Sequence, residues 1–215
     1  RDGRDLVRVT APRAFDPAGL ELASRWALDG ERLDIEVEGV GDFPVLVDPV
    51  WTSLGDSQST AKFGWAVAPA GDLDGDGRGE VIVSAPEYDS AYTNAGKVYL
   101  FEGQAGGLAS APAWTASGAA AGDQLGYAVA ALGDSDDDDL REIALGAPYA
   151  NVGLYADAGK VYVYEADANG DLPGSATWTL DGPNQASAYL GFSLAGLGDQ
   201  NKDGKDDLVV GAPGY

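Results

Sequence analysis

The sequence predicts an all-β fold built from repeated sheets of about four strands, and two observations carry this prediction. A Trp-Thr pair recurs at Trp51, Trp114 and Trp178, with spacings of 63 and 64 residues. Each copy also contains an apolar residue followed by Gly, an acidic loop opened by Gly-Asp, and a short apolar run ending in Ala-Pro. Such runs are typical of strands covered on both faces. Because one small sheet cannot bury both faces alone, the repeats predict stacked blades, as in a β-propeller.

The spacing inside the three copies is constant. In every copy the Gly that follows the apolar residue, here called the step glycine, lies 8 positions before the first loop Asp. The Pro lies 14 positions after that Asp. The step glycines are Gly64, Gly126 and Gly191, the first loop acids are Asp72, Asp134 and Asp199, and the prolines are Pro86, Pro148 and Pro213. Length varies only outside this block, as expected of surface loops. We therefore place the repeats at 51–113, 114–177 and 178–215.

The third copy is incomplete, and a different segment precedes the first. The Gly-Lys-Val-Tyr strands predicted at 97–101 and 160–164 have no counterpart in the third copy, so about two and a half blades are expected. Residues 1–50 form an N-terminal β-rich segment, in which alternating apolar residues around Asp29-Gly30 predict a β-hairpin unit. Residues 43–49 are expected to be a junction. The sequence has no Met, so we expect a piece of a longer protein.

Composition excludes several classes of function. The chain has 35 acidic and 13 basic residues, a net charge of −22, and neither His nor Cys. Nucleic acids and anionic membranes attract clustered Lys and Arg, so neither is an expected partner. Without His or Cys, the usual general base, thiolate nucleophile and zinc ligands are missing. No apolar run approaches the ~18–20 residues of a membrane helix, so no membrane insertion of this fragment is expected.

The acidic loops have the spacing of calcium loops. The first one, residues 72–80, places carboxylates at positions 1, 3, 5 and 9 and a Gly at position 6. Ca²⁺ takes about 6 to 8 oxygen ligands, which include a main-chain carbonyl at position 7 in such loops. The expected ligands are Asp72, Asp74, Asp76, Glu80 and the Arg78 carbonyl in the first loop; Asp134, Asp136, Asp138, Glu142 and the Leu140 carbonyl in the second; and Asp199, Asn201, Asp203, Asp207 and the Lys205 carbonyl in the third. Up to three calcium ions are expected.

Two alternatives bear on these loops. An EF-hand needs a bidentate acid at position 12 and flanking helices, but Val83, Leu145 and Val210 stand there, inside strand-like runs. The loops could also be plain solvated acidic turns, which three copies in a fixed register disfavour. The second loop has Asp139 in place of the turn glycine, so its occupancy is the open point, although Asp adopts left-handed backbone more readily than most residues.

The set Phe63-Gly64, Asp72 to Glu80 and Ala85-Pro86, repeated with Gly146-Ala147-Pro148 and Gly211-Ala212-Pro213, resembles the FG-GAP repeat of integrin α-subunit propellers and related bacterial secreted or surface proteins. The resemblance covers 51–215 and implies a propeller whose loops bind Ca²⁺. It also implies a non-catalytic, extracellular or cell-surface module for recognition or adhesion, with a protein or glycan partner.

Two other functions stay open: an accessory domain of a longer secreted enzyme, and a structural subunit that self-associates through its unclosed blades. The repeated Trp residues and Trp65 are expected to pack between blades rather than to bind sugars. Tyr92 and Tyr155, in loops of variable length, are the better candidates for ligand contact.

Overall fold

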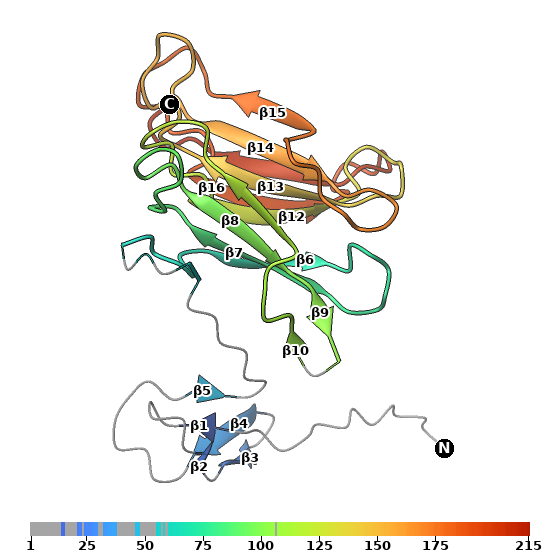
Figure 1. Cartoon of the computed structure of the whole chain (residues 1–215). Coiled ribbons are helices and arrows are strands. Elements are labelled where there is room, and N and C mark those ends of the chain that lie inside the picture. The colour runs from blue at the N-terminus through green and yellow to red at the C-terminus, as the bar shows by residue number, and fades with distance from the viewer. Residues whose placement is uncertain are drawn as a thin grey trace. The chain divides into compact units, whose positions relative to one another are not determined.

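The computed structural model (Figure 1) describes residues 60–105 and 107–215, together with Gly55, Asp56 and Gln58. Before residue 55 it describes the backbone of five strands between residues 14 and 47. The chain divides into two compact units, Arg1–Thr52 and Ser53–Tyr215. All regular elements of the described residues are β-strands, which confirms the predicted all-β class.

The N-terminal unit contains a hairpin and a small sheet. Strands β3 (Ser24–Asp29) and β4 (Arg32–Val37) pair antiparallel, with Asp29 opposite Arg32, at the place where the sequence predicts a β-hairpin. Strand β1 (Ala14–Phe15) pairs with both β2 (Glu21–Leu22) and β5 (Leu46–Val47). Strand β5 falls in the segment expected to be only a junction, so part of that segment belongs to the N-terminal sheet.

The second unit contains two antiparallel four-stranded sheets and a third of two strands. The first sheet consists of β6 (Val67–Gly71), β7 (Glu80–Ala85), β8 (Lys97–Phe101) and β11 (Trp114–Ser117). The second consists of β12 (Ala128–Gly133), β13 (Glu142–Ala147), β14 (Lys160–Glu165) and β15 (Trp178–Asp181). The third pairs β16 (Ser193–Gly198) with β17 (Asp207–Gly211). These two and a half blades agree with the predicted partial propeller.

The sheets are offset from the sequence repeats by one strand. Trp114 to Ser117 pair with Leu100 to Lys97 and complete the first sheet, and Trp178 to Asp181 complete the second in the same way. Trp51, the first of the repeated Trp residues, lies outside the described residues. A short hairpin of β9 (Gly103–Gln104) and β10 (Gly107–Leu108), which the sequence did not reveal, interrupts the connection between β8 and β11.

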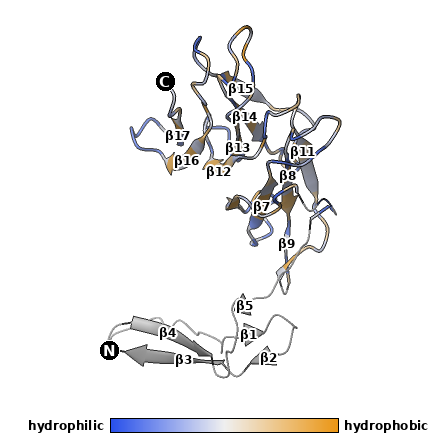
Figure 2. Ribbon diagram, turned by 90° about the vertical axis from the view of Figure 1, so that its left-hand side faces the viewer, coloured by the Kyte–Doolittle hydropathy of each residue, from blue (hydrophilic) through white to orange (hydrophobic). Residues whose placement is uncertain are grey.

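The core lies between neighbouring sheets, because alternate residues of each strand face opposite sides. On β13, Ile143 and Leu145 face the cluster shared with the first sheet, and Ala144 faces the cluster shared with the third. The first strands of the three sheets lie next to one another, since β12 contacts both β6 and β16. Figure 2 shows hydrophobic residues, in orange, on β12 and β16.

Two equivalent Trp residues show what the fourth strand of a blade does. The Trp114 ring meets the Tyr164 ring of the next sheet edge to face, with centroids 4.8 Å apart, and its Nε1 donates to the Pro173 carbonyl. Trp178 occupies the same place on the second sheet, next to a third sheet that has only two strands among the described residues, and it is 42% exposed. The repeated Trp is therefore a packing residue between blades where a complete neighbour is present.

Candidate metal centres

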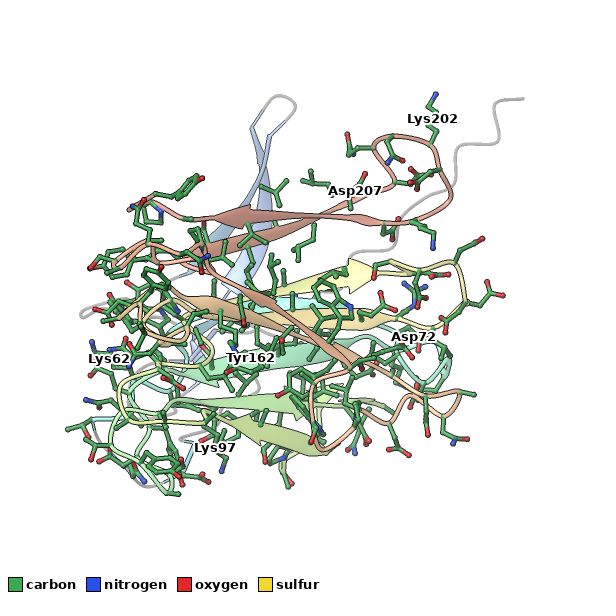
Figure 3. The ribbon with its side chains drawn as sticks, turned by 90° about the horizontal axis from the view of Figure 1, so that it is seen from above. Lys62, Asp72, Lys97, Tyr162, Lys202 and Asp207 are labelled. Atoms are coloured by element: carbon green, nitrogen blue, oxygen red, sulfur yellow. The ribbon has the colours of Figure 1, made fainter. Side chains whose placement is uncertain are left out.

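The three acidic loops connect the first and second strands of their sheets. Gly-Asp ends the first strand, the acidic residues turn the chain, and the acid at position 9 begins the second strand. Seen from above, Asp72 and Asp207 lie at one end of the strands, whereas Lys62 and Lys97 lie at the other (Figure 3). The predicted metal ligands are thus gathered at one end of the blades.

The same hydrogen bond closes each loop. The main-chain amide at position 6 donates to the carboxylate at position 1: Gly77 to Asp72 at 3.0 Å, Asp139 to Asp134 at 2.8 Å, and Gly204 to Asp199 at 3.0 Å. The donor residue has a left-handed backbone in all three loops, with φ of 87° at Gly77, 66° at Asp139 and 93° at Gly204. Asp139 therefore takes the conformation of the glycine that it replaces.

The acid at position 9 is fixed by a second shared bond. One carboxylate oxygen of Glu80, Glu142 and Asp207 accepts the main-chain amide of the residue at position 2, at 2.6, 2.7 and 2.9 Å respectively. Glu80 and Glu142 are buried. The other oxygen of Glu80 accepts the main-chain amide of Gly103 at 3.4 Å, whereas that of Glu142 has no hydrogen-bond partner among the described residues. Because this acid is the first residue of a strand, the sheet to which that strand belongs determines where its carboxylate lies.

The structure brings most predicted ligands of the first two loops together. Ligand atoms of Asp134, Asp136, Asp138 and Glu142 lie within 4.8 Å of one another, and so do those of Asp72, Asp74 and Glu80. Asp76 is not in the first group, because its carboxylate binds the Arg78 guanidinium at 2.5 Å. A cation in the first loop would have to compete with Arg78 for Asp76.

Two carboxylate oxygens in these loops are buried without a hydrogen-bond partner among the described residues, Glu142 Oε1 and Asp72 Oδ1. Glu142 is only 1% exposed. A buried carboxylate oxygen without a partner is costly, so such groups are normally paired or bind a metal ion. The oxygen-rich donor set and this free buried oxygen fit a hard cation such as Ca²⁺.

The pKa values of the two buried Glu residues also fit a cation in these loops. Burial raises the pKa of the Glu142 carboxyl, and the nearby Asp136 and Asp134 raise it further against the lowering bond from Ser135. Burial likewise raises the pKa of Glu80, with contributions from Asp74 and Asp72. Burial and the nearby carboxylates thus disfavour the ionised form of each buried Glu when its loop lacks a cation. A bound positive ion would reduce the free-energy cost of that ionisation.

The third loop is closed by the same main-chain bonds, but its carboxylates, among residues 199–207, form no group as tight as those of the other two. Asn201 donates its side-chain amide to the Asp203 carboxylate at 3.0 Å, and its amide oxygen accepts from the Asp203 main chain at 2.9 Å. The ligand roles of the residues in all three loops stay predictions, including those of Asp199, Asn201, Asp203 and Asp207 and of the carbonyls of Arg78, Leu140 and Lys205.

Residues outside the loops also contact the first site, and no pattern in the sequence indicates them. A Cβ at Gly170, in the connection between β14 and β15 of the next sheet, would lie 2.6 Å from the Asp74 Cα. Gly103 approaches the Gly79 carbonyl, at 2.7 Å for a Cβ placed there. A small cavity of about 80 Å³ lies between these segments and is lined by Asp74 and Glu80. The first loop is therefore enclosed by two neighbouring connections.

Aromatic residues gather at the opposite end of the strands. The residues that follow the step glycines, Trp65, Tyr127 and Phe192, contact in series, with ring centroids 5.4 and 4.8 Å apart. Trp65 combines this packing with 47% exposure. Tyr92 and Tyr155, the candidates for ligand contact, are 50% and 37% exposed. This end of the blades presents aromatic side chains to solvent, whereas the other presents carboxylates.

Repeated antiparallel blades with an acidic loop between their first two strands define a class of β-propeller repeat protein, and comparison with known sequences gives the family. Residues 63–101 and 190–215 match the FG-GAP repeat family. The chain therefore contains FG-GAP repeats and is similar to integrin α subunits. It is 37% identical to human integrin alpha-IIb over 163 residues, which is 73% of this chain and 15% of the integrin. It is 33% identical to chicken integrin alpha-6 over 153 residues, which is 71% of this chain and 13% of the integrin.

One relative of another kind is a phosphatidylinositol-glycan-specific phospholipase D from rat, 34% identical over 161 residues. The match covers 71% of this chain and 19% of that protein. The chain thus spans less than a fifth of the length of these curated relatives. Among the described residues, no helix is long and apolar enough to cross a membrane.

Proposed function

We propose that this chain is a calcium-stabilised, non-catalytic recognition or adhesion module that acts outside the cell or at the cell surface. The observation that carries the calcium part is the second loop, where four carboxylate residues converge and a buried Glu142 oxygen has no partner among the described residues. Similarity to integrin α subunits supports the recognition part. The partner is a protein or a glycan, and the exposed Tyr92 and Tyr155 are candidate contacts.

In this proposal the metal has a structural role. The sequence has no Cys, so no disulfide can cross-link the blades, and calcium in each loop would instead tie the first two strands together. Extracellular calcium modules have dissociation constants on the order of 10⁻⁴ to 10⁻³ M. A tenfold excess of calcium over that value stabilises the fold by about 1.4 kcal/mol per site. We further propose that the parent is a bacterial secreted or surface protein.

Thermal unfolding in the presence of chelator, calcium or magnesium tests the calcium part. Calcium is expected to raise the melting temperature of the chelated protein, and magnesium, which prefers a tighter octahedral shell, is expected to do so less. Asp74→Ala should remove part of the increase, and Asp89→Ala, an exposed acid outside the loops, should not. Identical melting curves with chelator and with calcium would refute a structural metal.

A second function is favoured by the phospholipase D relative: an accessory domain within a longer secreted enzyme. In that case the FG-GAP repeats would position or stabilise a catalytic domain outside residues 1–215. The sequence of the complete gene separates the two proposals, because only the accessory role requires an adjoining catalytic domain. Attachment of cells or glycans to the immobilised chain, dependent on calcium, would instead support direct recognition.

A further inference from the structure

The third acidic loop binds the second one across the boundary between neighbouring sheets. The Lys205 ammonium donates to the main-chain carbonyl of Asp136 at 2.6 Å. The main-chain amide of Asp206 donates to the carbonyl of Asp134 at 2.8 Å. Both acceptors belong to residues proposed as calcium ligands of the second loop, so the third loop helps to set the path of the main chain that carries them.

The loops also fit closely at this contact. Gly133, which precedes Asp134, has φ of 89°, and a side chain there would collide with the Asp206 carboxylate. Lys205 and Asp206 stand at positions 7 and 8 of their own loop, directly before the acid that begins β17. A change in the path of the third loop would therefore be transmitted to the first residue of the second.

The second loop has the greatest need for outside support. Six of its nine residues are acidic, and like charges about 4 Å apart repel by roughly 1 kcal/mol even in water. Asp137 and Asp139 have left-handed backbones, with φ of 71° and 66°, where the first loop has Gly75 and Gly77. Both features work against the closed form of the loop that gathers its carboxylates.

Lys205 supplies a positive charge without occupying a ligand. Its ammonium binds a carbonyl oxygen, so the carboxylates of Asp134, Asp136 and Asp138 stay available to a metal ion. Arg78 acts differently in the first loop, because it binds the carboxylate of a predicted ligand, Asp76. Lys205 therefore supports the second loop without blocking a proposed ligand, whereas Arg78 competes with a cation for Asp76 in the first loop.

We propose that Lys205 and Asp206 are positioning residues for the second metal loop, so that its calcium affinity depends on the third blade. The inference rests on the proposed binding of calcium to the second loop. Linkage makes the effect reciprocal: calcium that orders the third loop raises the affinity of the second, and calcium in the second raises that of the third by the same factor.

The test follows each loop separately by amide NMR of the full chain during a calcium titration. Lys205→Met keeps most of the aliphatic stem and removes the ammonium. Lys202→Met is the matched control, since it removes the same charge from the same exposed loop. The hydrogen bond that Lys202 donates to the Asp199 carboxylate comes from its main-chain amide and is kept in this variant. The amides of Asp139 and Leu140 report on the second loop, and that of Gly77 reports on the first.

Lys205→Met is expected to weaken calcium binding at the second loop about two- to tenfold relative to Lys202→Met, as for the loss of one hydrogen bond. Binding at the first loop should be equal in both variants. Asp203→Ala, which disables the third loop, should also weaken the second. Equal second-loop affinities in the two Lys variants would overturn the inference. Absence of any calcium-dependent shift in the second loop of the unmodified chain would refute the proposed function itself, and this inference with it.

Discussion

The buried Glu142 offers the sharpest test of how the loops work, through the substitution Glu142→Gln. Glutamine has nearly the same shape, and its amide oxygen can still accept the Ser135 amide that Glu142 accepts at 2.7 Å. The substitution removes a charge that is 1% exposed and has one oxygen without a partner among the described residues. The metal-free protein should therefore become more stable, whereas a proposed calcium ligand is lost.

The expected size follows from the burial. In Glu142→Gln an amide nitrogen replaces the unpartnered oxygen and can donate to a carboxylate of the same group, Asp134 or Asp136. Relief of one unpaired buried polar group in this way is worth about 1 to 3 kcal/mol. In a unit of this size each kcal/mol shifts the melting temperature by about 2–4 °C. With chelator, Glu142→Gln should therefore melt about 2–12 °C above the unmodified chain. With calcium the difference between the two melting temperatures should become smaller or change sign. The reason is that the second loop of the variant no longer contributes its share of about 1.4 kcal/mol at tenfold excess of calcium.

Scanning calorimetry with chelator and with calcium measures both effects. Asp137→Asn is the matched control: it removes one negative charge from the same loop, at an exposed position that is not a proposed ligand, and Asn tolerates the left-handed backbone. The control should keep the full response to calcium. A lower melting temperature of Glu142→Gln in chelator would show that the buried Glu142 charge does not destabilise the metal-free loop, and a response to calcium equal to that of the control would show that Glu142 does not bind calcium.

Three further predictions concern charge, backbone and packing. In chelator, the free energy of unfolding should fall as pH rises above about 4.5. The pKa values of Glu80 and Glu142 are raised in the folded state, so the folded state holds protons that the unfolded state has released. Thermal melts across that pH range measure the fall in stability. Asp139→Gly should stabilise the chelated protein by about 1 kcal/mol, since φ of 66° costs Gly nothing and one repelling charge is removed; a lower melting temperature would contradict this. Trp114→Ala should destabilise the fold by about 3–5 kcal/mol in urea unfolding, whereas Trp178→Ala, at 42% exposure, should cost clearly less; equal costs would disprove the packing role.

The sequence predicted the blades and the loops because both are set locally. The fixed spacing from step glycine to loop to Ala-Pro reflects a strand, a closed turn and a second strand, and the structure has all three in each copy. The limits of the sheets could not be read in the same way. A repeat has a period but no marked origin, so the strand at Trp114 could belong to either neighbour, and hydrogen bonds to β8 assign it to the first sheet.

Contacts that cross between blades were beyond the sequence for a different reason. Nothing in the repeat indicates that Lys205 binds the Asp136 carbonyl, or that Gly170 approaches Asp74, because both depend on how sheets stack. The diversion of Asp76 to Arg78 is a local contact, and the spacing of two residues could have suggested it. Local rules therefore predict each candidate site, and tertiary packing determines how the sites support one another.

A crystal structure of the chain grown in calcium would show whether the blade loops hold calcium. The expected result is an anomalous peak inside the second loop, with oxygens of Asp134, Asp136, Asp138 and Glu142 and the Leu140 carbonyl at about 2.3–2.6 Å. Glu142 Oε1 should become a ligand. A second loop that holds only water at saturating calcium, with Glu142 still unpaired, would show that this loop is not a calcium site.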